Sequence, residues 1–322
     1  MNENFKYVFG PVPSRRLGRS LGVDLVPFKT CTYDCIYCQL GRTTRKTVER
    51  KEWVPTAAVL EELKRKLASH PDYITFSGSG EPTLHSGLGE IIEQVRAMTK
   101  IPVAVLTNGS LLWQPEVRAE LALADVVMPS LDAGDDLLFQ AVNRPHPDIT
   151  FEKLVAGLEQ FRGEFSGQYW LEVLLLAGHT GLPAHVQEIA EIVRRIRPDR
   201  VQLNTAVRPP AEEHVRAVPP EGLAALAKAF GPEAEVIANY CILKATPQSH
   251  PSAEAVLALL KRRPCRVQDI AQGLGIKPAE VVKHLAGLEA NGCICRQRRG
   301  AEVFYRAAGR QADESQLERC SC

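Results

Sequence analysis

Residues 31–38, CTYDCIYC, contain three cysteines in the spacing Cys-x3-Cys-x2-Cys: Cys31, Cys35 and Cys38. Cysteine thiolates are the usual ligands of iron–sulfur clusters, most of which take four protein ligands. Three ligands can hold a [4Fe–4S] cluster and leave one iron open to another molecule. The spacing therefore predicts a loop that binds a [4Fe–4S] cluster with one open iron.

A structural zinc ion is the main alternative for this motif. A structural zinc site takes four ligands, so it needs a fourth Cys or His nearby. The next cysteine along the chain is Cys241, and His70 and His85 lack the spacing of a zinc knuckle. A second alternative, three incidental buried cysteines, is disfavoured because all three fall within eight residues.

Apolar runs alternate with amphipathic stretches between about residues 20 and 237. Stretches such as 56–70, 88–98 and 184–197 have apolar residues at the three- and four-residue spacing of a helix. The alternation predicts parallel βαβ units, and six of them fit a partial (β/α)6 barrel or a doubly wound open sheet. The expected strands are 21–26, 73–76, 103–106, 126–129, 170–176, 201–203 and 235–237.

Short polar motifs follow these expected strands and favour the barrel, because barrel enzymes build their sites at the carboxyl ends of the strands. SGSGEPTL (77–84) follows the second strand, and its glycines let the backbone approach a ligand closely. TNG (107–109), SLD (130–132) and QLNTAVRPP (202–210) end the third, fourth and sixth strands. Turn formation is the alternative role for each motif, since Asn-Gly and Asp are common in turns.

The cysteine motif, with Tyr37 as the aromatic residue before its last cysteine, and the GSGEP turn resemble the radical S-adenosylmethionine (SAM) superfamily over about residues 10–235. The resemblance implies a partial TIM-like (β/α)6 barrel, a [4Fe–4S] cluster on the three cysteines, and SAM bound to the open iron. An electron from the cluster would cleave SAM to a 5′-deoxyadenosyl radical, which abstracts hydrogen from a substrate. The implied SAM contacts are Tyr37, Gly78, Ser79, Gly80, Glu81, Pro82, Thr107, Asn108, Ser130, Asp132, Leu203 and Asn204.

Several segments, among them GPVPSRR, VLTNGSLLW and LNTAVRPP, are similar to a poorly assigned group of Fe–S oxidoreductases related to the wybutosine-synthesis radical enzymes. This likeness covers the expected catalytic domain only. An N-terminal flavodoxin-like domain is not expected from the sequence, so the tRNA reaction of those enzymes is not carried over.

Arginines after the expected strands point to an anionic substrate. Arg144, in the segment NRPH with His146, and Arg208 would project over the barrel mouth. A guanidinium offers a fixed fork to a carboxylate or phosphate, although an ion pair that stabilises a loop is equally compatible. The same two roles are open to Arg15, Arg16 and Arg19, and no side chain is assigned as a catalytic acid, base or hydrogen donor.

The length of 322 residues suits one large domain and a smaller one. We expect the barrel in residues 1–237, a proline-containing linker in 238–252, a winged helix-turn-helix domain in 253–308 and a polar tail in 309–322. Residues 253–310 contain eleven Lys and Arg against five Asp and Glu, whereas the whole chain has a net charge of +1.

This basic excess indicates an anionic partner or a solvated basic face. Basic side chains on a recognition helix and wing suit phosphate contacts, which leaves three roles open: docking of a nucleic-acid substrate, DNA binding by an Fe–S/SAM-dependent regulator, or capture of a peptide or protein. The candidate contacts are Lys277, Lys283, His284, Arg296, Arg298 and Arg299.

Nine cysteines in a chain with no secretory signal indicate metal binding rather than disulfides. Two Cys-x-Cys pairs near the C-terminus could bind a second metal or stay reduced; they are Cys293 with Cys295 and Cys320 with Cys322. No apolar run approaches the roughly 18 residues of a membrane span. We therefore expect a cytoplasmic enzyme with no membrane partner and an electron donor such as flavodoxin or ferredoxin.

Overall fold

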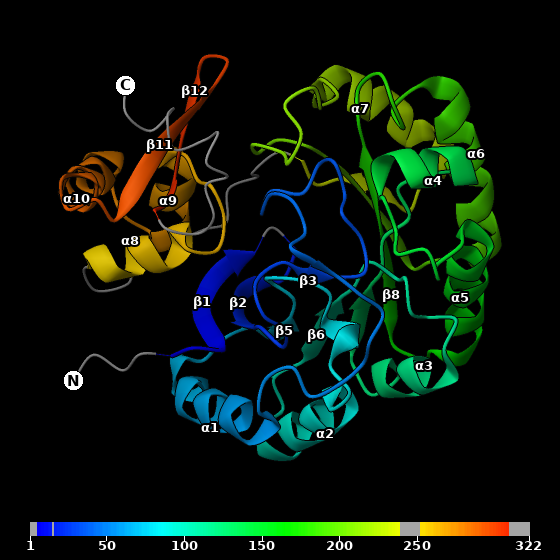
Figure 1. Cartoon of the computed structure of the whole chain (residues 1–322), viewed down its shortest axis with the longest axis horizontal. Helices are drawn as coiled ribbons and strands as arrows, with labels where there is room; N and C mark the ends of the chain where they lie inside the picture. Colours follow the sequence, from blue (N-terminus) through cyan, green and yellow to red (C-terminus); the bar gives the residue numbers. More distant parts are fainter. Residues whose placement is uncertain (1–4, 15, 239–251, 309–322) are drawn as a thin grey trace. The chain divides into compact units, whose positions relative to one another are not determined.

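The computed structural model describes residues 5–14, 16–238 and 252–308 (Figure 1). The chain forms two compact units. The first comprises Met1–Pro11 and Arg16–Tyr240, and the second comprises Val12–Arg15 and Cys241–Cys322. The predicted linker and tail lie almost wholly outside the described residues, as do Arg15, Cys241, Cys320 and Cys322.

An eight-stranded sheet is the centre of the first unit. Its strand order is β1-β2-β5-β6-β7-β8-β9-β10, and every pairing from β2 to β10 is parallel. This mostly parallel α/β sheet agrees with the expected partial TIM-like barrel. The strands are β1 (Val8–Ser14), β2 (Gly18–Val23), β5 (Tyr73–Phe76), β6 (Val103–Leu106), β7 (Val126–Met128), β8 (Gln168–Leu175), β9 (Arg200–Thr205) and β10 (Ala234–Val236).

Helices connect the parallel strands, and Figure 1 shows α1, α2, α3, α5 and α6 around the outside of the sheet. The helices are α1 (Thr56–Lys66), α2 (Leu88–Met98), α3 (Pro115–Leu121), α4 (Asp136–Val142), α5 (Phe151–Glu164), α6 (Pro183–Ile196) and α7 (Pro220–Ala227), with short 3-10 turns at Leu67–Ser69, Pro82–Leu84 and Lys228–Phe230. A two-residue parallel pair, β3 (Thr30–Cys31) and β4 (Arg45–Lys46), lies in the loop between β2 and α1.

The two faces of the sheet differ because successive side chains of a strand point to opposite sides. Apolar side chains such as Ile74, Val105 and Leu171 lie in the main hydrophobic core with the buried faces of the helices. On the alternate positions, Ala104, Val126, Met128 and Trp170 form a small second cluster. The polar residues Thr75, Glu172, Gln202 and Asn204 occupy the corresponding alternate positions of β5, β8 and β9, so this inner face can receive polar groups.

Each of the seven predicted strands has a counterpart in the structure, with shifts of a few residues at the ends. Residues 73–76 and 103–106 agree with β5 and β6, and the helix expected at 88–98 agrees with α2. The sequence did not predict β1, whose segment VFGPVPS contains glycine and two prolines. Proline is tolerated in a strand mainly at a sheet edge, which is where β1 lies.

The second unit contains three helices followed by an antiparallel hairpin. These are α8 (Ala253–Leu260), α9 (Val267–Leu274), α10 (Pro278–Ala290), β11 (Ile294–Arg299) and β12 (Glu302–Ala307). Gly275 ends α9 in the left-handed conformation, with a φ of 68°. The unit has its own hydrophobic core, which includes Val256, Ile270, Val281 and Leu285. In the described ranges, no helix combines the length and apolar character needed to cross a membrane.

Substituting Phe161→Ala tests the packing between α5 and the sheet. Phe161 is fully buried, and its ring stacks on Phe165 at a centroid distance of 4.9 Å. We expect the free energy of unfolding of the first unit to fall by about 3–5 kcal/mol, because the change leaves a cavity. Urea denaturation followed by circular dichroism measures this. Leu137→Ala, at a side chain 82% exposed on α4, is the control and should change stability by less than about 0.5 kcal/mol. Equal urea midpoints for Phe161→Ala and wild type would contradict the packing.

Candidate cofactor site

The three cysteines lie on one loop, residues 31–38, which begins at the end of β3 and which we call the cysteine loop. All three have free thiols and are partly exposed. Among the described residues, their sulfur atoms do not form a set in which all lie within 4.8 Å of one another. A single zinc ion with Zn–S distances of about 2.3 Å would bring its sulfur ligands within about 4 Å. The three sulfur atoms are therefore not arranged as the ligands of a single zinc ion.

The protein around the cysteine loop disfavours bare thiolates. Burial, together with the Glu81 carboxylate, raises the pKa of Cys31 to about 12. Burial also raises the pKa of Cys35 well above its usual value, with Cys31 as the next cause. Ionised sulfurs at these positions therefore need a nearby positive charge, which the iron atoms of a cluster supply.

One nitrogen donor faces each cysteine sulfur. The Asn108 side-chain amide lies 3.6 Å from Cys31 Sγ, and the Lys29 Nζ lies 3.1 Å from Cys38 Sγ. The Asn143 side-chain amide lies 3.6 Å from the remaining sulfur, that of Cys35. N–H donors toward thiolate ligands are part of the second shell of Fe–S clusters. The donor set therefore fits a [4Fe–4S] cluster.

Glu81 joins the turn after β5 to the motif after β6. Its buried carboxylate accepts hydrogen bonds from Thr107 Oγ1 (2.6 Å) and from the Asn108 backbone N–H (2.8 Å). It also accepts bonds from the backbone N–H and the hydroxyl of Thr83, at 3.1 and 2.7 Å. Burial raises the pKa of Glu81, and these hydrogen bonds oppose that rise. The carboxylate thus orders the GSGEP turn.

The glycines of the GSGEP turn, residues 78–82, are required by contacts within the chain. A Cβ atom on Gly80 would lie 1.8 Å from the Thr30 carbonyl oxygen, and Gly78 has a φ of 124°. The backbone N–H of Ser79 donates to Asp24 Oδ1 at 2.8 Å. The turn is therefore packed directly against the chain that leads from β2 into the cysteine loop. Pro82, its last residue, begins a short 3-10 turn.

Asp132 links the cysteine loop to the end of β7. Its carboxylate accepts hydrogen bonds from the Tyr37 hydroxyl, from Asn143 Nδ2 (3.0 Å) and from the Leu174 backbone N–H (3.0 Å). Burial raises the pKa of Asp132 to about 6, against the effect of these donors. Ser130 extends β7 by a parallel backbone bridge to Glu172 on β8. Tyr37 and Asp132, both predicted site residues, are thus in direct contact.

The side chains of Leu203 and Asn204, the predicted SAM contacts at the end of β9, point to opposite faces of the sheet. Asn204 Nδ2 donates to Glu172 Oε1 at 3.1 Å on the inner face of the sheet, where Arg16 also bonds Glu172. The Leu203 side chain is fully buried in the core between the sheet and the helices. Only the backbone of Leu203 is therefore available to a ligand on the side of Asn204.

The predicted substrate arginines have partners within the chain. Arg144 NH1 forms an ion pair with Glu212 at 2.6 Å, and Arg42 approaches the same carboxylate oxygen at 2.8 Å. Arg208 is nearly buried and donates to Gln39 Oε1 at 3.1 Å. His146, two residues after Arg144, donates its backbone N–H to the Thr32 carbonyl oxygen. Arg19 NH2 donates to the Ser69 carbonyl oxygen at 2.8 Å.

Two residues of the site were missed by the sequence analysis, Lys29 and Asn143. Lys29 lies two residues before Cys31, and Asn143 directly precedes Arg144. Asn143 is the C-cap of α4, and its backbone carbonyl accepts the Asp34 N–H at 3.1 Å. The segment NRPH, which contains Asn143, was recognised in the sequence as part of the barrel mouth. Nothing in that segment indicates that Asn143 approaches a cysteine 108 residues away.

The predicted contacts of the second unit lie on α10 and its hairpin. Lys277 and Lys283 are exposed at the start and in the middle of α10, and Arg298 is exposed on β11. Arg296 is also exposed but forms an ion pair with Glu289. His284 and Arg299 are partly exposed, and so are the two cysteines of the hairpin region, Cys293 and Cys295.

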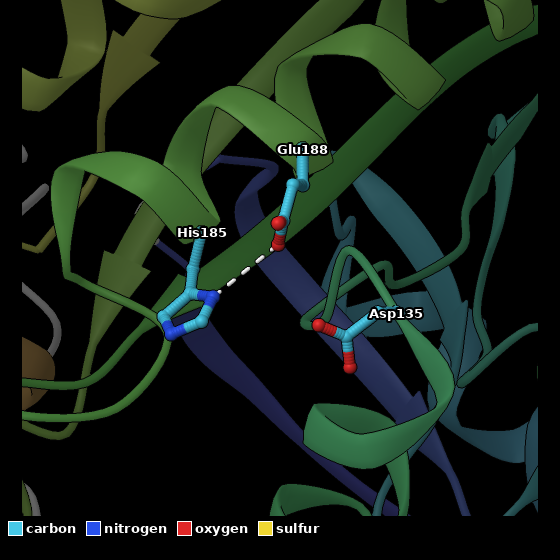
Figure 2. Close-up of side chains that lie close together, drawn as sticks. All are labelled: Asp135, His185 and Glu188. Carbon is cyan, nitrogen blue, oxygen red and sulfur yellow. Dashed lines mark hydrogen bonds and ion pairs between the residues drawn. The ribbon is translucent and has the colours of Figure 1, made fainter.

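A further group of possible metal ligands lies outside the cysteine loop (Figure 2). One ligand atom each from Asp135, His185 and Glu188 lies within 4.8 Å of the others. Asp135 Oδ1 caps α4 by accepting the Leu138 N–H at 2.7 Å, and His185 Nδ1 lies 3.2 Å from Glu188 Oε2 on α6. These contacts account for the arrangement without an ion.

Comparison with known proteins gives the family of the chain. Residues 25–196, more than half of the chain, match the Radical SAM superfamily. A UPF0026 protein of Helicobacter pylori is 34% identical over 310 residues, which cover 94% of this chain and 98% of that protein. The chain belongs to the radical SAM superfamily and shares a family with this UPF0026 relative. It is therefore an enzyme that uses a [4Fe–4S] cluster and SAM.

Other relatives are similar over part of their length. A protein of Brachyspira hyodysenteriae named GTPase Obg is 45% identical over 227 residues, which cover 70% of this chain. The chain spans only a third of that relative's length. A UPF0026 protein of Methanocaldococcus jannaschii is 37% identical over 212 residues, and the match covers 66% of that protein.

Solved structures support the fold of the first unit. The fold is similar to that of Streptococcus suis SuiB bound to S-adenosylmethionine, with a TM-score of 0.52, 13% identity, and coverage of 68% of this chain and 50% of SuiB. A radical SAM methyltransferase from Sphaerobacter thermophilus gives a TM-score of 0.51 at 18% identity, with coverage of 67% of this chain and 65% of that chain. At these identities the likeness establishes the fold.

Glu81→Gln tests the connection between the GSGEP turn and the TNG motif. The carboxylate accepts four hydrogen bonds, and a glutamine would turn an N–H toward at least one of these donors, at a cost of about 1–3 kcal/mol. We expect SAM to bind the anaerobically reconstituted variant about tenfold more weakly by isothermal titration calorimetry. Glu90→Gln, at an exposed position on α2, is the control. Unchanged SAM affinity in Glu81→Gln would contradict this role.

Asp132→Asn tests whether the buried carboxyl of Asp132 makes the free energy of unfolding depend on pH. Because the pKa of Asp132 is raised from 3.8 to about 6, the folded state binds more protons than the unfolded state between these values. The free energy of unfolding of the cluster-free protein should then fall as pH rises through this window, by about 3 kcal/mol in total. Urea titrations across the window should show this slope for wild type and for the exposed control Asp136→Asn. Asp132→Asn should lack it, and an unchanged slope would contradict the shift.

Proposed function

We propose that the chain is a radical SAM enzyme that abstracts hydrogen from an anionic substrate and holds its cluster through Cys31, Cys35 and Cys38. When bound, the reduced cluster and SAM together supply reductive cleavage to a 5′-deoxyadenosyl radical. One observation carries the proposal: three cysteines on one loop, each with its own nitrogen donor, lie beside turns at the carboxyl ends of β5 and β7.

The residues of the chain would position SAM. Glu81 fixes the Thr107 hydroxyl and the Asn108 backbone, and this leaves the GSGEP turn ordered beside the cysteine loop. We assign the amino-acid part of SAM to this region. The Tyr37–Asp132 pair, Ser130 and Asn204 lie at the ends of β7 and β9, and we assign the ribose and adenine to them.

The anionic character of the substrate is supported by unequal charges beside the cysteine loop. Arg42 and Arg144 share the single carboxylate of Glu212, which leaves a positive excess at this pair. Arg42 is well exposed and can reach an incoming anion. The resemblance to wybutosine-synthesis enzymes concerns the catalytic domain alone, so we assign no tRNA reaction from it.

The experiment that tests the proposed reaction measures 5′-deoxyadenosine. Anaerobically reconstituted wild-type protein, reduced with dithionite and mixed with SAM, should release it over time, as measured by liquid chromatography and mass spectrometry. Cys35→Ala should bind less iron and release none above background, because the cluster loses a ligand. Cys293→Ala, at a partly exposed cysteine of the second unit, should behave as wild type. A fully reconstituted wild type that releases none would overturn the proposal.

For residues 253–308 of the second unit, we propose a winged helix-turn-helix domain that docks nucleic acid. The order of three helices followed by a hairpin supports this assignment. Exposed Lys283 on α10 and exposed Arg298 on the hairpin are positioned as such domains place phosphate contacts. The two rival roles are an Fe–S/SAM-dependent DNA-binding regulator and a module that captures a peptide.

Binding to nucleic acid should weaken steeply with salt. We expect the full chain to bind a tRNA mixture or duplex DNA in fluorescence anisotropy, with the slope of log affinity against log salt reduced by about one unit in each of Lys283→Ala and Arg298→Ala. Lys64→Ala, at an exposed lysine of α1, is the control. Binding to tRNA would indicate a nucleic-acid substrate, whereas binding to duplex DNA would indicate an operator recognised by a regulator. Absence of salt-dependent binding to both would favour the peptide role.

A reductant must deliver one electron to the cluster, and we propose flavodoxin or ferredoxin in this role because both carry single electrons at low potential. The cytoplasmic location expected from the sequence stays a prediction.

A further inference from the structure

Lys29 is a buried lysine whose ammonium group faces a cysteine sulfur. Its side chain is among the buried polar groups, with 3% of the residue exposed, and its Nζ donates to Cys38 Sγ at 3.1 Å. Across the described residues, no carboxylate forms an ion pair with it. A buried ammonium without an anionic partner is costly, so the position requires negative charge close by.

The backbone of Lys29 is held firmly by its neighbours, and this fixes the point from which its side chain starts. Lys29 has a φ of 57°, in the left-handed region that a side-chain-bearing residue seldom adopts. Its N–H donates to the Ser79 carbonyl of the GSGEP turn at 2.6 Å. Its carbonyl accepts the backbone N–H groups of Thr44 and Arg45, at 3.2 and 3.1 Å. The strained conformation persists because both neighbouring segments fix it.

Lys29 differs in charge from the other two donors to the cysteine loop. Asn108 and Asn143 offer neutral amides at 3.6 Å, whereas Lys29 offers a full positive charge at 3.1 Å. A charge-assisted hydrogen bond is about twice as strong as a neutral one. The negative charge that Lys29 requires is therefore the Cys38 thiolate, with the cluster that it binds.

We propose that Lys29 is a positioning residue that raises the reduction potential of the cluster through Cys38. The inference rests on the proposed function, since it needs a cluster on the cysteine loop. Reduction transfers one electron from a low-potential donor to the cluster and adds one negative charge. A fixed positive charge stabilises the reduced form more than the oxidised form, because the reduced form carries more negative charge.

The test measures the midpoint potential of the reconstituted full chain by redox titration followed by electron paramagnetic resonance. In Lys29→Met, which keeps the length of the side chain and removes its charge, we expect the equilibrium constant for reduction to fall at least tenfold, equivalent to about 59 mV for one electron. Lys29→Arg should recover most of this loss. Lys51→Met, at a lysine paired with Glu49 on the surface, should match wild type.

Two results would overturn the inference. One is a midpoint of Lys29→Met equal to that of wild type. The other is a large loss of SAM affinity with no shift in the midpoint, which would make Lys29 a ligand of the SAM carboxylate instead. If Lys29→Met binds too little iron to titrate, Lys29→Gln keeps a donor toward Cys38 without the charge, and the same outcomes apply to it.

Measurements on the wild-type protein distinguish a failure of this inference from a failure of the proposed function. A wild-type cluster that ignores added SAM would count against the proposed function itself. A wild-type cluster that responds to SAM, together with an unshifted Lys29→Met midpoint, would remove only the role of Lys29.

Discussion

The structure depends on one electrostatic constraint: at two of the three loop cysteines, Cys31 and Cys35, a bare thiolate is unfavourable. Burial holds the Cys31 and Cys35 thiols in their neutral form in the absence of a cation. The donors that face the sulfurs, two amides and one ammonium, become useful only when the sulfurs are negative. Bound iron cations would stabilise the thiolates and would also make the facing donors favourable. Members of the radical SAM superfamily, to which this chain belongs, hold such iron as a [4Fe–4S] cluster.

Two buried carboxylates connect the cysteine loop and the GSGEP turn to the strands of the barrel by hydrogen bonds. Glu81, in the GSGEP turn, accepts hydrogen bonds from the residues after β6. Asp132, at the end of β7, accepts hydrogen bonds from Tyr37 of the cysteine loop and from the backbone of β8. The parallel order of the strands brings their carboxyl ends to one edge of the sheet, so these bonds can be short. The fold positions the turns, and the carboxylates hold them around the cysteine loop.

The sequence predicted those parts of the site that local motifs define. The cysteine spacing, the GSGEP turn and β5 and β6 follow from short segments with strong preferences. Lys29 and Asn143 could not be predicted, because each acts on a cysteine only after folding brings the two together. The direction of Leu203 also depends on the strand's register, which places its side chain in the core and that of Asn204 on the inner face.

The most direct measurement of the central claim is electron–nuclear double resonance on the reduced, reconstituted protein with SAM labelled with nitrogen-15 at its amino group. Direct binding of SAM to an iron without a protein ligand predicts a hyperfine coupling from that nitrogen. A clustered protein whose spectrum lacks this coupling, and is unchanged by added SAM, would contradict the account.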